Sequence, residues 1–174
     1  MTLHLRHATP ADSRLLSDLG FRIYSAHFKP LWVSETEMNN FLHDEYSLPV
    51  LEQSLKESGV AWYVAQTERP IGFMKVTWEA AIPGTSDVGV LLNKLYLDPA
   101  ETGKHYGKLM FEHAVRLARN NDKRSLWLEV LEQNEGAYRF YQRQGMLCVN
   151  EVLFETASQQ SVLKIMRMPL QASI

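Results

Sequence analysis

A strand, helix, strand pattern in the middle of the chain constrains the fold more than any other feature of the sequence. Residues 88–97 (VGVLLNKLYL) form a long apolar run typical of a strand buried on both faces, and Asp98 and Pro99 end it. Residues 107–121 then place their apolar side chains on one helical face. Residues 125–130 (SLWLEV) are again strand-like and apolar. The pattern therefore predicts a strand–helix–strand unit.

Capping patterns predict three helices ahead of this unit. Thr9 begins the first, whose helical pattern Gly20 interrupts, so that a bend or break is expected there. Ser34 begins the second, and Ser47 begins a third that is expected to end near Gly59. A further short helix is expected over residues 134–144, after the central unit.

Several segments outside the central unit have the alternation or the β-branched and aromatic content of strands. They are residues 3–8, 60–66, 71–78, 146–154 and 162–168. The second and third are separated by a short turn, which predicts an antiparallel hairpin.

The composition limits the class of protein. A chain of 174 residues with 45% hydrophobic residues can fill one core, so a single domain over residues 1–174 is expected. The net charge of -2 gives no general attraction to nucleic acid or to an anionic membrane. Cys148 has no second cysteine to pair with, and no long apolar segment is present, so we expect a cytosolic protein without disulfides.

The loop between the strand at 88–97 and the following helix has the features of an anion site. The start of a helix presents backbone N–H groups, and Gly103 and Gly107 allow a ligand to approach the backbone closely. Lys104 and Lys108 add positive charge beside the helix dipole. Between residues 94 and 124 seven Lys/Arg face four Asp/Glu, an excess of three positive charges in an acidic protein. The segment predicts phosphate binding, although such turns also occur without a ligand; the two common nucleotide-binding glycine motifs are absent.

A second chemical segment follows residue 130. Asn134 is placed to cap a short helix that carries Tyr138 and Tyr141 on one side and stops at Gly145. Acyl transfer from a thioester to an amine needs a proton donor for the departing thiolate, and a tyrosine hydroxyl can serve. The alternative is a packed aromatic pair without a chemical role.

Together the two segments, LYLDPxxxGKHYGKLM and NxxAxxFYxxxGM, resemble the GNAT superfamily of acetyl-CoA-dependent N-acetyltransferases. The resemblance covers residues 60–170, and WLEVLEQN and VLKIMRMPL look most similar to its bacterial spermidine/spermine-acetylating branch. It implies an α/β fold with a splayed, mostly antiparallel mixed sheet flanked by helices. It also implies that residues 60–170 form the acetyl-CoA-binding core and residues 1–59 a helical acceptor-side part.

The resemblance also assigns roles by position. Tyr141 corresponds to the general acid that protonates the coenzyme A thiolate in many relatives, and the remaining matched positions would contact the cofactor. These are Leu95, Tyr96, Leu97, Gly103, Lys104, His105, Tyr106, Gly107, Lys108, Asn134 and Tyr138.

Two positions depart from the family pattern. Thr102 stands where Gln or Arg is usual, and His105 stands where Gly is usual. Histidine is among the residues that tolerate positive φ, and backbone N–H groups hold most of such a ligand, so we expect a modest loss of affinity. The imidazole of His105 could also donate to a phosphate. Pairing of His105 with His113 as metal ligands has little support, and no metal is expected.

The acceptor amine must lose a proton before it attacks, since an alkyl ammonium has a pKa of about 10. Glu79, at the end of a predicted strand, is the first candidate base, and Glu129 and Glu132 are others; each is also explained as a surface carboxylate. Residues 1–60 contain eight Asp/Glu and five Lys/Arg, which suits a cationic small-molecule amine such as a polyamine.

Other functions remain open at this stage. A protein N-terminus or lysine could be the acceptor. The departures at Thr102 and His105 also leave room for a coenzyme A-binding sensor without turnover, and an interaction domain that keeps only the fold is a third class. The sequence leaves a homodimer open.

Overall fold

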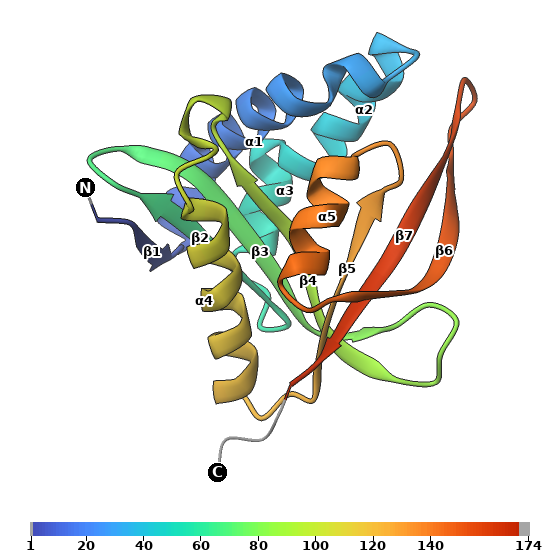
Figure 1. Ribbon diagram of the computed structural model, residues 1–174. Helices are drawn as coiled ribbons and strands as arrows, with labels where there is room; N and C mark the ends of the chain where they lie inside the picture. The colour runs from blue at the N-terminus through green and yellow to red at the C-terminus, as the bar shows by residue number, and fades with distance from the viewer. Residues whose placement is uncertain (1, 171–174) are drawn as a thin grey trace. The chain divides into compact units, whose positions relative to one another are not determined.

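The computed structural model describes residues 2–170, which form a seven-stranded sheet with helices (Figure 1). The strand order is β1-β2-β3-β4-β5-β7-β6. The strands are β1 His4–His7, β2 Val60–Gln66, β3 Pro70–Ala81, β4 Val88–Leu97, β5 Ser125–Leu131, β6 Leu147–Glu155 and β7 Gln160–Pro169. The helices are α1 Ser13–Phe28, α2 Glu35–Tyr46, α3 Leu48–Ser54, α4 Tyr106–Asn120 and α5 Glu135–Arg143. Three 3₁₀ turns are η1 Pro10–Asp12, η2 Lys29–Leu31 and η3 Pro99–Glu101.

The sheet confirms the predicted α/β class with a mixed, mostly antiparallel arrangement. β1 pairs antiparallel with β2, and β7 pairs antiparallel with both β5 and β6. β4 and β5 are parallel, with Val90 opposite Leu126 and Leu91 opposite Trp127. The central segment is therefore the strand–helix–strand unit that the sequence predicts, because the α4 crossover allows the two strands to run in the same direction.

The chain divides into two compact units. The first comprises the residues up to Val76 together with Lys94–Phe111, and the second comprises Thr77–Asn93 and the residues from Glu112 onwards. The boundaries cut through β3, β4 and α4.

Aromatic side chains fill the core of the first unit. Tyr46 is fully buried, and its ring meets that of Phe73 at 5.7 Å between centroids, with the two planes near perpendicular. Gly20 lies beneath the same ring, because a Cβ at residue 20 would approach the ring carbons to 2.1 Å. Helix α1 is continuous from Ser13 to Phe28, so Gly20 gives space to Tyr46 and does not end the helix.

The predicted helix starts at Ser34 and Ser47 are confirmed, whereas Thr9 is the N-cap of the 3₁₀ turn η1 and α1 starts only at Ser13. One predicted helix end is wrong. The hydroxyl of Ser34 accepts a hydrogen bond from the backbone N–H of Glu37 at 3.2 Å, which caps α2. Ser47 precedes α3, but that helix ends at Ser54 rather than near Gly59. The chain leaves the helix through bonds of the tighter 3₁₀ type, such as Glu57 N–H to the carbonyl of Ser54 at 3.1 Å.

In the second unit a small apolar cluster surrounds β5. Trp127 packs with Ile82 and Ile165, and all three are buried. The indole N–H of Trp127 donates to the carbonyl of Ala80 at 3.2 Å, so the buried ring has its polar atom paired. β5 pairs with β7 along its whole length, from Ser125 opposite Pro169 to Leu131 opposite Leu163. The residues that follow β5, which include α5, therefore begin from a firmly paired strand.

Among the described residues, no helix has the length and apolar content needed to cross a membrane.

Candidate functional site

The loop between β4 and α4 has an unusual backbone conformation. After η3 the chain passes through Gly103 with φ 79° and His105 with φ 66°, so two residues close together adopt the left-handed region. His105 is one of two non-glycine residues with positive φ in the described part of the chain. A Cβ at Gly103 would meet no atom within 4 Å, so the backbone there is open on that side. This geometry agrees with the expectation that His105 tolerates a conformation usually left to glycine.

The loop ends at the start of α4, where the backbone N–H groups of the first helical turn point out of the end of the helix. The first i to i−4 bond described here runs from Leu109 N–H to the carbonyl of His105 at 3.2 Å. The N–H groups of Tyr106 and Gly107 come before that bond and have no carbonyl partner within the helix. Together with the positive end of the helix dipole, this arrangement fits a diphosphate or another anionic group.

The side chains around the loop contribute less to an anion site than the sequence suggests. The hydroxyl of Thr102 donates to the carbonyl of Pro99 at 2.8 Å, so it closes the η3 turn. The ammonium of Lys104 pairs with Glu101 at 3.0 Å. Backbone groups are therefore the main anion-binding feature of this segment.

The end of β4 is held closely by its neighbours in the first unit. The ring of Tyr96 lies 5.6 Å from the rings of both Phe28 and Phe73. Gly72 approaches the carbonyl of Tyr96 so closely that a Cβ there would lie 2.3 Å from the oxygen. The ring Nε2 of His27 donates to the carbonyl of Leu97 at 2.6 Å. The strand end with Leu95, Tyr96 and Leu97 thus has a fixed backbone.

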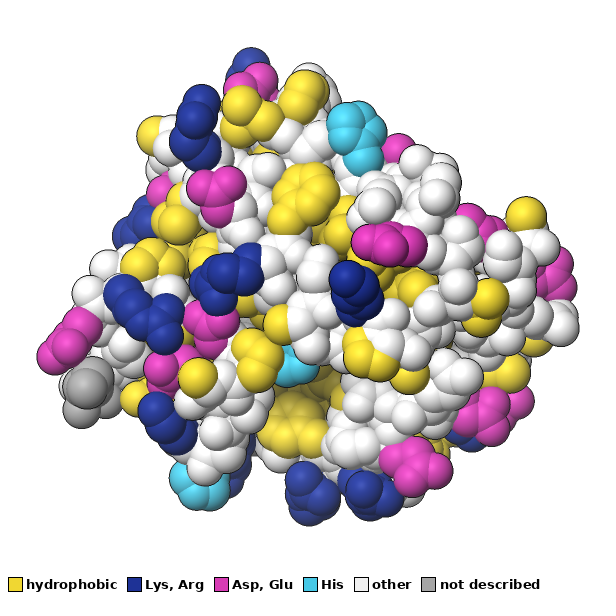
Figure 2. All heavy atoms as spheres, turned by 90° about the horizontal axis from the view of Figure 1, so that it is seen from above, with side chains coloured by type: hydrophobic (Ala, Val, Ile, Leu, Met, Phe, Trp, Pro, Cys, Tyr) yellow, Lys and Arg dark blue, Asp and Glu magenta, His cyan; other side chains and the backbone are white. Residues whose placement is uncertain are grey.

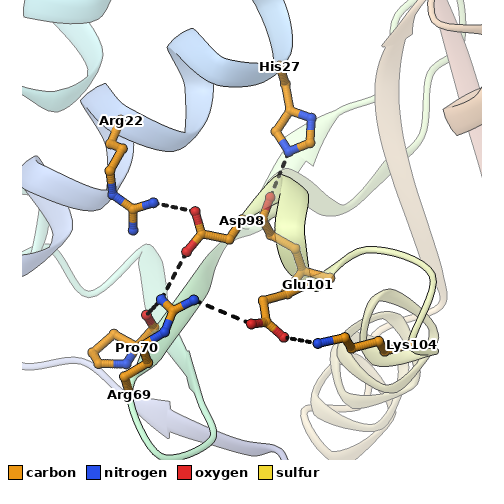
Figure 3. Close-up of polar contacts among 8 residues, drawn as sticks. Arg22, His27, Arg69, Pro70, Asp98, Glu101 and Lys104 are labelled. Carbon is orange, nitrogen blue, oxygen red and sulfur yellow. Dashed lines mark hydrogen bonds and ion pairs between the residues drawn. The ribbon is translucent and has the colours of Figure 1, made fainter.

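Sequence reasoning missed an ionic network next to this strand end (Figure 3). The sequence pattern marks Asp98 only as the end of a strand, but one of its carboxylate oxygens accepts a hydrogen bond from Arg22 of α1 and the other accepts one from Arg69 at 3.1 Å. Arg69 also reaches Glu101 at 3.3 Å, and Glu101 holds Lys104. An acidic residue between a buried strand and a proline was the available signal, but its partners lie 76 and 29 residues away in the sequence.

Burial alone would raise the pKa of the Asp98 carboxyl group. The hydrogen bonds from Arg22 and Arg69 outweigh that effect and hold the pKa below its ordinary value. Asp98 is therefore ionised at neutral pH.

The second chemical segment lies in the second unit, on α5. The side-chain oxygen of Asn134 accepts from the N–H of Ala137 at 3.3 Å, which confirms the predicted cap. The ammonium of Lys164 lies 5.5 Å above the ring of Tyr138. Tyr141 is partly buried beside Phe140, with 5.1 Å between ring centroids, and burial raises the pKa of its phenol well above the ordinary value. The hydroxyl of Tyr141 therefore keeps its proton over a wide pH range.

The three candidate bases differ in their surroundings. Glu79 is exposed and pairs with Lys123 at 3.1 Å. Glu129 lies within β5, and although its side chain reaches solvent, desolvation by neighbouring protein atoms raises the pKa of its carboxyl group. Glu132 follows β5, where its N–H donates to the carbonyl of Val162 at 2.9 Å.

The predicted site residues fall into two groups by unit. Those of the β4 end, the loop and the start of α4 belong to the first unit: Leu95, Tyr96, Leu97, Gly103, Lys104, His105, Tyr106, Gly107 and Lys108. Those proposed for proton transfer or for contact from α5 belong to the second: Glu79, Asn134, Tyr138 and Tyr141.

On the face seen in Figure 2, Lys and Arg side chains are interspersed with Asp and Glu. That face carries no continuous surface of one charge, which agrees with the small net charge. Within residues 2–170 no group of three His, Cys, Asp or Glu side chains has the arrangement of a metal site.

Comparisons with known proteins connect this geometry to a chemistry. The profile of the Acetyltransferase (GNAT) family matches residues 26–146. An uncharacterised N-acetyltransferase of Lactobacillus delbrueckii subsp. lactis, from the pepI 3' region, is 28% identical over 123 residues, which cover 70% of this chain and 71% of that protein. The peptidyl-lysine N-acetyltransferase YjaB of Salmonella typhimurium is 30% identical over 110 residues, 62% of this chain and 65% of that protein.

The fold has a solved counterpart. The PaiA N-acetyltransferase of Thermoplasma acidophilum, crystallised in complex with coenzyme A, superposes with a TM-score of 0.78 over 97% of this chain and 99% of that one. Sequence identity is 20%, so this likeness concerns the fold.

Proposed function

Because this chain belongs to the GNAT family of acetyltransferases and uses acetyl-CoA, we propose that it acetylates a primary amine by direct attack, with Tyr141 as the general acid. When bound, acetyl-CoA supplies the acetyl group as an activated thioester. The protein must then hold the donor, supply a proton to the departing sulfur and remove one from the amine.

The single observation that best supports the proposal is the position of Tyr141 on α5, a helix that the Asn134 cap fixes and that lies within the residues matched by the GNAT family profile. Burial raises the pKa of the Tyr141 phenol, so Oη carries a proton at neutral pH, as an unperturbed phenol also would. Proton donation by a positioned side chain typically contributes about 10²- to 10⁴-fold to a rate. In this proposal Tyr138 lines the site and Tyr141 acts on the leaving group.

The proposed donor site uses backbone groups of the first segment and the side-chain amide of Asn134 in the second. Gly72 lies against the carbonyl of Tyr96 and His27 donates to the carbonyl of Leu97, and a strand end fixed in this way suits a segment that bonds the pantetheine arm. The left-handed residues Gly103 and His105 and the first turn of α4 suit the diphosphate. The amide NH₂ of Asn134 is a separate donor from the oxygen used in its cap, and we assign it to the pantetheine region.

For the base we retain Glu79 and place Glu129 beside it as the competing candidate. A general base works best with a pKa near the operating pH. The raised pKa of Glu129 supports that residue, whereas Glu79 shares its charge with Lys123. The pH dependence of kcat/KM in two variants, Glu79→Gln and Glu129→Gln, decides between these residues. Substitution of the true base removes the fall in kcat/KM at acidic pH, and substitution of the other residue leaves it in place.

Two classes of acceptor have different support. The acidic excess of residues 1–60 and the resemblance to the spermidine/spermine branch favour a polyamine. However, Asp12, Glu35 and Glu45 already pair with basic side chains, which leaves less negative charge for a cationic substrate. The relative YjaB, a peptidyl-lysine acetyltransferase, favours a lysine side chain in a peptide.

A panel of amines tests the proposal. Release of the coenzyme A thiol is followed with acetyl-CoA and, in turn, spermidine, spermine, simple alkylamines and lysine-containing peptides. We expect turnover with at least one primary amine, and the acceptor with the highest kcat/KM assigns the class. Tight binding of acetyl-CoA with no thiol release across the panel would instead identify a sensor.

We also propose a cytosolic location, since the exposed thiol of Cys148 persists in a reducing compartment. Cell fractionation tests this. Homodimerisation is a separate question, answered by sedimentation of the purified chain.

A further inference from the structure

The loop that leads from β4 into α4 lacks apolar anchoring. Leu97 and Asp98 are buried, and the next buried residue is Met110; every residue from 99 to 109 is exposed or only partly buried. Two of these residues, Gly103 and His105, also hold left-handed φ values. Packing of apolar side chains therefore cannot hold this loop in one conformation.

Ion pairs, in place of apolar packing, hold this loop to the rest of the first unit. Asp98 is the buried centre, with 8% of its side chain exposed, and it joins Arg22 of α1 to Arg69 of the β2–β3 turn. Its backbone takes part as well, because its N–H donates to the carbonyl of Ile71 at 2.8 Å and its carbonyl accepts from Glu101 N–H at 2.9 Å. One residue thus ties the loop start to β3, to α1 and to η3.

The contacts continue along the loop. Arg69 uses its second nitrogen for Glu101, and the other oxygen of Glu101 holds the ammonium of Lys104, next to Gly103. Figure 3 shows the side chains as one chain of contacts that begins at Arg22 and ends at Lys104. Three cations and two carboxylates leave a single excess positive charge beside a proposed anion site.

We propose that Asp98 is a positioning residue of the donor site: through Arg22 and Arg69 it holds the 99–105 loop in the conformation that receives the acetyl-CoA diphosphate. The inference rests on the proposed assignment of this loop to the cofactor. Asp98 itself contacts neither the thioester nor the amine in this account. Its loss therefore weakens binding of the donor and leaves the chemical step unchanged once the donor is saturating.

The variant Asp98→Asn keeps the size of the side chain and removes its charge. We expect the Kd for coenzyme A, measured by calorimetry, to rise about 10- to 100-fold, because hydrogen bonds between charged groups are roughly twice as strong as neutral ones and two are weakened together. The KM for acetyl-CoA should rise in parallel, while kcat at saturating donor stays within about threefold of the wild type.

Asp12→Asn is the matched control in the same unit. Asp12 is a largely buried carboxylate that pairs with an arginine, Arg6, at 2.9 Å, and its pKa is also lowered, chiefly by the hydrogen bond from Arg6. It caps the start of the first helical segment through the N–H of Thr9. We expect Asp12→Asn to lower the thermal midpoint with the coenzyme A Kd within about twofold of the wild type.

If Asp98→Asn does not fold, variants of its two arginine partners test the same inference. Arg22→Ala and Arg69→Ala remove guanidinium groups that are about half exposed, at 53% and 54%. Each should raise the Kd several-fold, and the double variant should raise it by less than the product of the two, since both act through Asp98. Kd values within twofold of the wild type in these variants, or a loss of kcat in step with thermal stability, would overturn the inference. A wild-type chain that binds no coenzyme A would overturn the donor-site assignment instead.

Discussion

The two left-handed residues of the β4–α4 loop, Gly103 and His105, have the most direct consequence for the proposed donor binding. Gly103 and His105 place the backbone for the first turn of α4, and the side chain of His105 is exposed. The sequence predicted that a histidine would be tolerated at a position where relatives have glycine, and the φ of 66° agrees with that prediction. A single substitution, His105→Gly, tests separately whether the imidazole also contacts a phosphate.

His105→Gly separates backbone from side chain. A left-handed conformation costs an L-residue about 1–2 kcal/mol, and glycine relieves this but loses about 0.5–1 kcal/mol of chain entropy, so stability should change little. If backbone N–H groups hold the diphosphate, the coenzyme A Kd measured by calorimetry should stay within about threefold of the wild type or improve.

Asp122→Gly is the control for this prediction, because Asp122 is the other non-glycine residue with positive φ among those described, at 58°. It follows the last turn of α4 and should leave coenzyme A binding unchanged. Binding that is tenfold weaker in His105→Gly alone would assign the imidazole to the phosphate and contradict the backbone account.

At the scale of elements, the approach of β3 to β4 decides how the strand end is presented. Gly72 of β3 faces the carbonyl of Tyr96, and the N–H of Asp98 bonds to the carbonyl of Ile71. A side chain at residue 72 would push against backbone atoms, which cannot move aside as a flexible side chain can.

Gly72→Ala should therefore displace the strand end. We expect a loss of about 1–3 kcal/mol in the free energy of unfolding, as in other overpacked sites, and a higher KM for acetyl-CoA. Gly59→Ala is the control, because a Cβ at Gly59 meets nothing within 4 Å, and its stability should change by no more than about 0.5 kcal/mol. If denaturant titration gives the two variants the same free energy of unfolding and their KM values for acetyl-CoA are also equal, the Gly72 contact has no effect on the strand end.

Sequence patterns predicted the elements that depend on local signals and missed the features that depend on distant partners. The cap of α5 by Asn134 follows from residue type and spacing, and the positive φ of His105 was expected from the family resemblance, in which glycine is usual at that position. In contrast, the sequence pattern predicted a bend or break of α1 at Gly20. The actual reason for this glycine is the ring of Tyr46, which lies against it from another helix and cannot be recognised from local sequence. The partners of Asp98 likewise come from other elements.

At the scale of the whole molecule, the residues proposed for function are divided between the two compact units. The proposed strand-end and diphosphate contacts come from the first unit, whereas Asn134, Tyr138, the proposed acid and the two retained candidate bases belong to the second. Family membership accounts for acetyl-CoA and for N-acetylation, whereas the acceptor depends on this chain's own residues. The role of Tyr141 is the central claim, because it separates catalysis from binding of the donor alone.

The turnover of Tyr141→Phe tests this claim most directly, with Tyr138→Phe, three residues earlier on the same helix, as its control. Loss of the hydroxyl should lower kcat about 10- to 1000-fold and leave the acetyl-CoA Kd unchanged, while Tyr138→Phe keeps most of the wild-type kcat. Because the protonated phenol is the active form and its pKa is raised by burial, wild-type activity should show no loss from this group below about pH 10. A Tyr141→Phe enzyme that releases coenzyme A thiol at the wild-type rate would contradict the account.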